Sequence, residues 1–133
     1  MNILQGKISQ IESSQRMSLI GIDVDGDTFS SIILEGQKTD LNYREGDLVN
    51  LLFKETEVGI AKNLSGQISF RNRFSAKIKT IEKGLILARV FLDYKSHSME
   101  SIISTRSAND MNLKENDPVE WLVKSNEISL MKV

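Results

Sequence analysis

The chain carries the same sequence unit twice, with matching positions displaced by 70 residues. Residues 40–49, DLNYREGDLV, return as residues 110–119, DMNLKENDPV, and residues 31–33, SII, return as residues 101–103. A repeat of this length indicates two tandem copies of one small domain. Any functional site should therefore be sought twice, and matching positions can be compared with each other.

The repeat divides the 133 residues into two units of about 62 residues each. We expect a first domain over residues 1–63 and a second over residues 64–133, in which residues 64–71 form the linker and the entry strand. Domains this small rarely have a core worth more than ~3–5 kcal/mol, so they are expected to bury surface against each other or against other subunits. Apolar and polar residues alternate towards the end of the linker, which indicates a rigid connection running straight into a strand.

Each copy shows short runs of strand-forming residues separated by turn signals, with one polar helical segment. Five short strands around a small core, with one helical segment, are typical of an OB-like barrel. We therefore predict an all-β protein of two tandem OB-like five-stranded barrels, each with one short helical segment. The helical segments are expected at residues 35–43 and 107–113, and strands at residues 7–11, 19–24, 29–34, 48–53, 58–61, 85–92, 99–103, 118–123 and 128–131.

Composition excludes several classes of site and location. The chain has no cysteine and one histidine, His97, so disulfides, thiolate metal sites and zinc or copper centres are not expected. No stretch approaches the ~18 consecutive apolar residues of a membrane span, and the N-terminus does not have the pattern of a signal peptide. We expect a cytoplasmic protein without membrane insertion.

Motifs and charge exclude further function classes. No phosphate-binding loop is present, and His97 has no serine or cysteine partner at a recognisable spacing, so no enzyme is expected. The net charge of −1 and the scattered aromatic residues argue against direct nucleic-acid binding. Residues 1–63 carry a net charge of −4 and residues 72–133 a net charge of +2, so an anion site is expected in the second copy or its linker.

One candidate site lies at the end of the linker, where Ser69, Phe70, Arg71 and Asn72 place a hydroxyl, a guanidinium and an amide within four residues. The cluster offers several hydrogen-bond donors and no carboxylate, as an oxyanion requires. An ordinary linker with an exposed arginine and a turn-forming asparagine is the alternative.

Two further candidates lie later in each copy. Lys54 and Lys124 occupy matching positions after an apolar strand, and Ser125 adds a hydroxyl beside Lys124. The alternative to anion binding is that these lysines only protect the edge of a strand. Ser107 and Gln37 occupy matching positions at the start of the helical segments, where unpaired amides can face an anion. Ser107 can equally be a simple helix N-cap.

Taken in order, these segments resemble the Mop family of molybdate-binding domains, also called TOBE-like domains or molbindins, in its tandem form. The similarity lies in residues 69–78, 112–119 and 123–128 of the second copy and in residues 6–8, 42–49 and 53–58 of the first. It covers essentially the whole chain. The resemblance implies molybdate or tungstate as ligand, with no other cofactor.

By the same resemblance, the oxyanion is contacted by Ser69, Arg71, Asn72, Ser107, Lys124 and Ser125, with the backbone amide of Phe70 also available. Lys54 and Gln37 are expected to complete a site built mainly by another copy. The implied function is reversible binding of molybdate or tungstate in the cytoplasm, for storage, homeostasis or sensing. An OB-fold interaction module for nucleic acid or protein, without anion binding, is the alternative.

The resemblance also implies self-association as a homotrimer, in which tandem copies replace a hexamer of single domains. Family members occur fused to a DNA-binding domain or to a transporter ATPase. Since neither is found in this sequence, a separate transporter or regulator is the expected partner of a sensor.

Overall fold

The computed structural model describes residues 1–34 and 42–133, and it is built almost entirely of antiparallel strands. Each copy contributes four principal strands, one 3₁₀ turn and one short final strand. The first copy holds β1 (Asn2–Ser14), β2 (Met17–Val24), β3 (Asp27–Leu34), β4 (Leu48–Phe53), η1 (Glu55–Glu57) and β5 (Gly59–Ala61). The second holds β6 (Asn72–Lys83), β7 (Leu87–Tyr94), β8 (His97–Ser104), α1 (Thr105–Asp110), β9 (Pro118–Val123), η2 (Ser125–Glu127) and β10 (Ser129–Lys132).

The predicted all-β class and the five-stranded units are confirmed. The second copy's helix begins two residues before the predicted start, because Ser104 is its N-cap and accepts a hydrogen bond from the Ser107 amide at 3.0 Å. The helix predicted over residues 35–43 of the first copy falls mostly outside the described residues. Among the described residues, no helix has the length and apolar character needed to cross a membrane.

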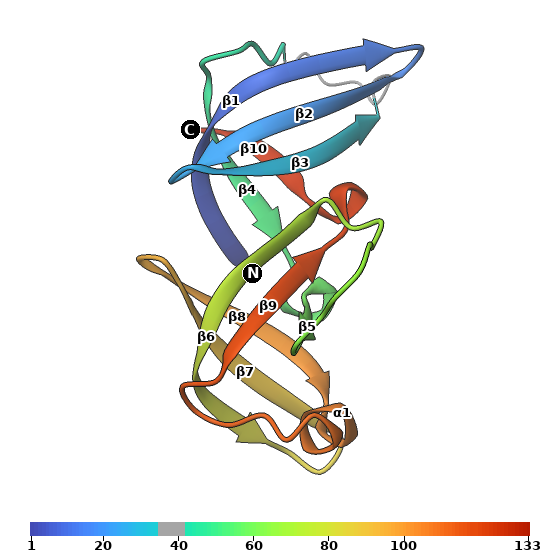
Figure 1. Ribbon diagram of the computed structural model, residues 1–133. Helices are drawn as coiled ribbons and strands as arrows, with labels where there is room; N and C mark the ends of the chain where they lie inside the picture. The colour runs from blue at the N-terminus through green and yellow to red at the C-terminus, as the bar shows by residue number, and fades with distance from the viewer. Residues whose placement is uncertain (35–41) are drawn as a thin grey trace.

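The two sheets exchange their last strands. One sheet has the order β10-β4-β1-β2-β3 and the other β5-β9-β6-β7-β8, so β5 of the first copy pairs with β9 and β10 of the second pairs with β4 (Figure 1). The boundary between residues 63 and 64 therefore separates units of sequence, and one strand from each side crosses into the other sheet.

Side chains at matching positions fix this exchange. The buried hydroxyl of Ser31 donates to the carbonyl of Ile128 at 2.8 Å, and that of Ser101 donates to the carbonyl of Val58 at 2.6 Å. Both bonds join β3 or β8 of one copy to the residue that precedes the exchanged strand of the other. Because the donors and acceptors are buried, breaking either bond leaves an unsatisfied polar group.

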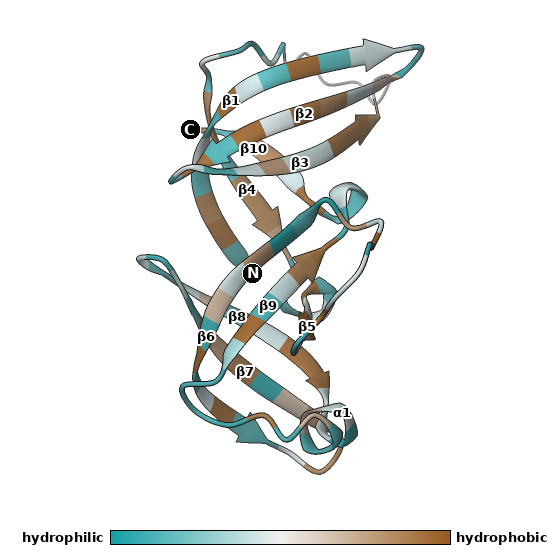
Figure 2. Cartoon of the chain, viewed as in Figure 1, coloured by the Kyte–Doolittle hydropathy of each residue, from teal (hydrophilic) through white to brown (hydrophobic). Residues whose placement is uncertain are grey.

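The two sheets share one hydrophobic core. Its centre is aromatic: Trp121 stacks on Phe53 with ring centroids 5.7 Å apart, and Phe74 stacks on Phe29 at 4.1 Å. Both pairs join one copy to the other. The apolar segments of the central strands meet in the middle of the molecule, between the two sheets (Figure 2).

The linker differs from its prediction. Residues 64–71 contain no strand, and β6 begins only at Asn72. Gly66 has a φ of +86°, in the left-handed region that glycine favours, and it turns the chain before β6 begins. Residues 69–71 therefore follow an irregular path, which leaves their side chains and amides outside any sheet.

Candidate oxyanion-binding site

A cavity of about 540 Å³ lies beside the start of β6 and is lined by residues of both copies. Five of the nine candidate residues line it, from two segments that are more than 50 residues apart in sequence: Ser69, Phe70, Arg71, Lys124 and Ser125. The other lining residues are Glu12, Leu19, Ser30, Ile32 and Asn126.

The strand register explains why the two candidate segments meet. β6 and β9 are antiparallel, and Asn72 at the start of β6 lies opposite Val123 at the end of β9. The residues just before β6 and just after β9 must therefore emerge from the sheet side by side. The chain turns at both points, into the linker on one side and into η2 on the other, so the polar side chains gather at this edge.

The cavity carries an excess of positive charge. Arg71 and Lys124 are exposed, and neither forms an ion pair with any described residue. The Lys124 Nζ lies 6.0 Å from the centroid of the Phe70 ring, a cation–π contact at the limit of its range. Glu12 supplies the one carboxylate among the lining residues. Two free cations with hydroxyls beside them suit an anion that accepts several charge-assisted hydrogen bonds.

Two carboxyl groups meet near Lys124. A hydrogen bond with Glu57 raises the pKa of the Glu127 carboxyl, and the charges of Lys124 and Lys54 oppose that shift. Glu57 belongs to η1 and Glu127 to η2, so the two turns approach each other through these side chains.

The opposite wall of the cavity comes from the first sheet, and the sequence analysis missed it. Glu12 pairs with Leu19 across β1 and β2, and Leu19 pairs with Ile32 across β2 and β3, so the three form one row across the sheet. No local pattern marks these residues, because they reach the cavity through contacts between the two copies. Asn126 could have been found, since it directly follows Lys124 and Ser125.

Asn72, a predicted ligand-binding residue, is fully buried and outside the cavity lining. Its side-chain amide donates to the backbone carbonyl of Ser30 at 2.9 Å, and its side-chain oxygen accepts from the Ser30 amide at 2.7 Å. Asn2 makes the same pair of bonds with the backbone of Glu100, both at 2.9 Å. The two asparagines thus hold the outer strands β3 and β8 against the other copy.

We expect the substitution Asn72→Ala to destabilise the ligand-free protein by about 1–3 kcal/mol, because both backbone groups of Ser30 lose their partner in a buried place. Urea denaturation without molybdate measures this loss. Asn2→Ala is the matched control, and it should cost a similar amount. An Asn72→Ala protein that keeps its stability but loses oxyanion binding would instead assign the amide to the ligand.

None of the remaining described candidates lines the cavity. Ser107 belongs to α1, which Figure 1 places at the far end of the second sheet from the turn after β9, and its hydroxyl accepts a hydrogen bond from Ser104 at 2.9 Å. Lys54 precedes η1 and is not among the residues that line the cavity. Gln37 lies outside the described residues. The structure thus brings five candidates to one cavity, and Asn72, Ser107 and Lys54 are not among the residues that line it.

Comparison with known proteins places this architecture in a family. The model of the TOBE domain matches residues 68–130. The molybdenum-pterin-binding protein 3 of Clostridium pasteurianum is 32% identical over 65 residues, which are 48% of this chain and 96% of that protein. The chain belongs to the Mop (TOBE) domain family. The predicted family is thereby confirmed.

Other Mop-domain relatives match nearly the whole chain. The molybdenum import ATP-binding protein ModC of Brucella abortus (strain 2308) is 30% identical over 124 residues, which are 92% of this chain. The chain spans only 32% of the length of ModC. A crystal structure of the cytoplasmic molybdate-binding protein ModG, with molybdate bound, superposes with a TM-score of 0.94 at 21% identity and covers 99% of this chain and 96% of that one. The overall tandem fold is therefore shared with ModG.

Proposed function

We propose that this Mop-domain protein binds molybdate or tungstate reversibly in the cytoplasm, for storage, homeostasis or sensing, without catalysing a reaction. The observation that carries the proposal is the cavity in which the free cations of Arg71 and Lys124 converge with the hydroxyls of Ser69 and Ser125. Relatives whose names refer to molybdenum or molybdate support the choice of ligand. A separate transporter or regulator is the proposed partner where the protein serves as a sensor.

The donor set suits a tetrahedral dianion. Such an anion presents four oxygens and no hydrogen-bond donors, and it is recognised by charge-assisted hydrogen bonds from guanidinium, ammonium, hydroxyl and amide groups. The irregular backbone of residues 69–71 adds amides that no sheet uses. The proposed donors are themselves cationic or neutral, so the binding mode that we propose needs no metal ion to balance the charge of the anion.

Molybdate is expected to stabilise the folded protein, and EDTA to leave its stability unchanged. Ligand at ~100 times its dissociation constant adds about 2.7 kcal/mol to the free energy of unfolding. Thermal denaturation with millimolar molybdate, tungstate or EDTA measures both effects, and the Arg71→Ala/Lys124→Ala double variant is the control that should not respond to the oxyanions. A melting temperature that molybdate does not raise, or that EDTA lowers, would contradict the proposed function.

We also propose that the chain assembles as a homotrimer. Exposed apolar side chains gather at two different places: Met17, Leu19, Ile32 and Leu34 on β2 and β3, and residues 85–87 at the β6–β7 hairpin, where Leu85 is 95% exposed. The end of β3 carries the apolar colour in Figure 2. Two unlike patches on one chain favour head-to-tail contacts, which close into a ring.

Light scattering is expected to give a mass near three times the 15.0 kDa of the chain. Replacing Leu85 and Ile86, both largely exposed, with serine should lower that mass without unfolding the sheets. Circular dichroism of the same variant controls for folding. A wild-type monomer that binds molybdate with full affinity would refute the assembly.

A further inference from the structure

The cavity beside Arg71, here called the oxyanion cavity, has a counterpart position in the sequence repeat. Shifting each lining residue by 70 positions gives the residues of that counterpart. Ile32 and Glu12 keep their type, as Ile102 and Glu82, and Lys124 is matched by Lys54. Arg71 is matched by Met1, and Ser69 and Phe70 have no counterpart. Three of the remaining positions change charge. The hydroxyls of Ser30 and Ser125 are replaced by the carboxylates of Glu100 and Glu55, and Leu19 is replaced by Arg89.

In the structure Arg89 and both of these carboxylates already have partners of opposite charge. The Arg89 guanidinium forms an ion pair with the Glu100 carboxylate across β7 and β8. Glu55, in η1, accepts a hydrogen bond from the terminal ammonium of Met1; that bond and the nearby charge of Arg89 both lower the pKa of the Glu55 carboxyl. In the cavity beside Arg71, by contrast, the guanidinium has no carboxylate partner among the described residues.

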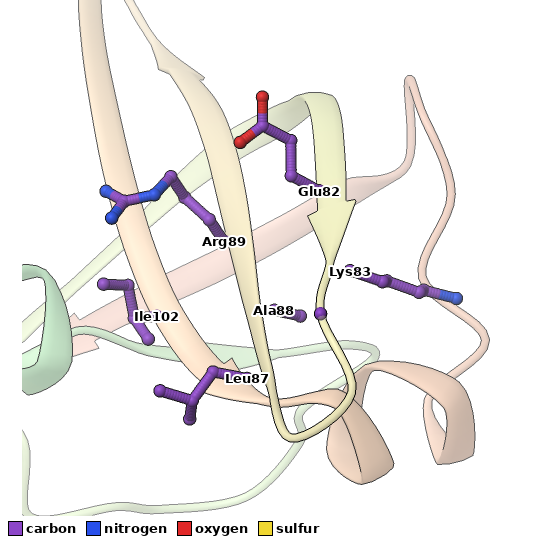
Figure 3. Close-up of a pocket in the computed structure, with 7 residues that line it drawn as sticks. Glu82, Lys83, Leu87, Ala88, Arg89 and Ile102 are labelled. Carbon is purple, nitrogen blue, oxygen red and sulfur yellow. The ribbon is translucent and has the colours of Figure 1, made fainter.

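The space beside Arg89 has also changed. A smaller cavity, of about 310 Å³, is lined by Arg89, Ile102 and Glu82, which match three residues of the oxyanion cavity. Its other walls are Lys83, Gly84, Leu87 and Ala88 of the β6–β7 hairpin, and no residue of η1 lines it. Figure 3 shows Arg89 and Lys83 extending to opposite sides of this hairpin, so the two cations do not converge.

Charge decides what each position can hold. The oxyanion cavity offers Arg71 and Lys124 against Glu12, whereas the counterpart offers Arg89, Lys54 and the Met1 ammonium against Glu55, Glu82 and Glu100. A dianion placed there would meet three carboxylates and would have to displace Glu100 from Arg89. Like charges at such distances repel, and partial burial reduces solvent screening of that repulsion.

We propose that the counterpart position is a latent oxyanion site, with Arg89 and Lys54 as its cationic donors, which the carboxylates of Glu100 and Glu55 hold closed. This inference rests on the proposed function. It follows that, of these two positions, the wild-type protein fills only the cavity beside Arg71, with one oxyanion per chain. Removing the two carboxylates should open the second position, because it frees the Arg89 guanidinium and leaves one carboxylate, Glu82, at the counterpart.

The test exchanges residues between the matching positions. In the Glu55→Ser/Glu100→Ser variant, equilibrium dialysis with tungstate should count one more bound anion per chain than in the wild type. Adding Arg89→Ala to that variant should remove the extra anion. The mirrored Ser125→Glu/Ser30→Glu variant should bind one anion fewer than the wild type. If the serines disturb the fold, the Glu55→Gln/Glu100→Gln variant, which keeps the side-chain size, replaces them in the same test.

Anomalous scattering of tungsten in crystals locates the anions. The wild type should show a peak beside Arg71 and Lys124 and none beside Arg89 and Lys54, and the double variant should show both. A wild type with no bound tungstate would overturn the proposed function itself. A wild type with both peaks, or double variants that bind tungstate beside Arg71 but gain no second anion, would leave that function intact and overturn the latent site.

Discussion

Replacing Arg71 or Lys124 with alanine is expected to weaken molybdate binding by roughly 1.5–3 kcal/mol each, about ten- to a hundredfold in the dissociation constant. Both side chains line the same cavity, and neither is bound to a carboxylate in the ligand-free protein. Each therefore loses a charge-assisted hydrogen bond to the anion without freeing a compensating partner. Titration calorimetry with molybdate measures the change.

Lys54→Ala is the matched control for Lys124→Ala, because the two lysines occupy equivalent positions of the repeat and precede equivalent turns. It should leave the affinity nearly unchanged, as should Arg44→Ala on an exposed turn. If Lys54→Ala or Arg44→Ala weakened binding as much as Arg71→Ala, only the overall charge of the protein would matter. The assignment of the cavity would then be wrong.

Most strands could be predicted because their signals lie within a few neighbouring residues. Alternating side chains, the Asp25-Gly26 turn and the repeat mark the strands β2 to β5 and β7 to β10 to within two residues. The two longest strands, β1 and β6, were predicted less completely. The exchange of β5 and β10 carries no such signal. β4 and β9 occupy matching positions and offer equivalent edges, so each short strand has two similar partners in sequence terms. The path of the chain after η1 and η2 selects the partner in the other copy.

The candidate site, too, could be predicted only where its signals lie within a short segment of sequence. Arg71 and Lys124 were identified by type and motif, and the register of β6 against β9 then brings them together. Asn72 belongs to the same motif, yet its burial depends on where β3 of the other copy lies, which no short segment encodes. The wall of Glu12, Leu19 and Ile32 escaped prediction for the same reason.

Replacing Trp121 with alanine is expected to cost about 3–5 kcal/mol of stability, a large share of the ~5–15 kcal/mol of a typical domain. Trp121 is fully buried and stacks on Phe53 of the other copy. The loss should therefore affect both copies together. Calorimetry at fixed protein concentration should show one transition in the wild type and one transition at lower temperature in the variant.

Glu115→Ala, on an exposed turn, is the control and should change stability by no more than about 0.5 kcal/mol. Two separate transitions, with only one of them shifted by Trp121→Ala, would mean that the copies fold independently. One transition is expected for a physical reason. Each copy supplies a strand to the other's sheet, so neither sheet is complete unless both copies are folded. The oxyanion cavity is lined from both sides of this shared structure, and it should be lost in the same step.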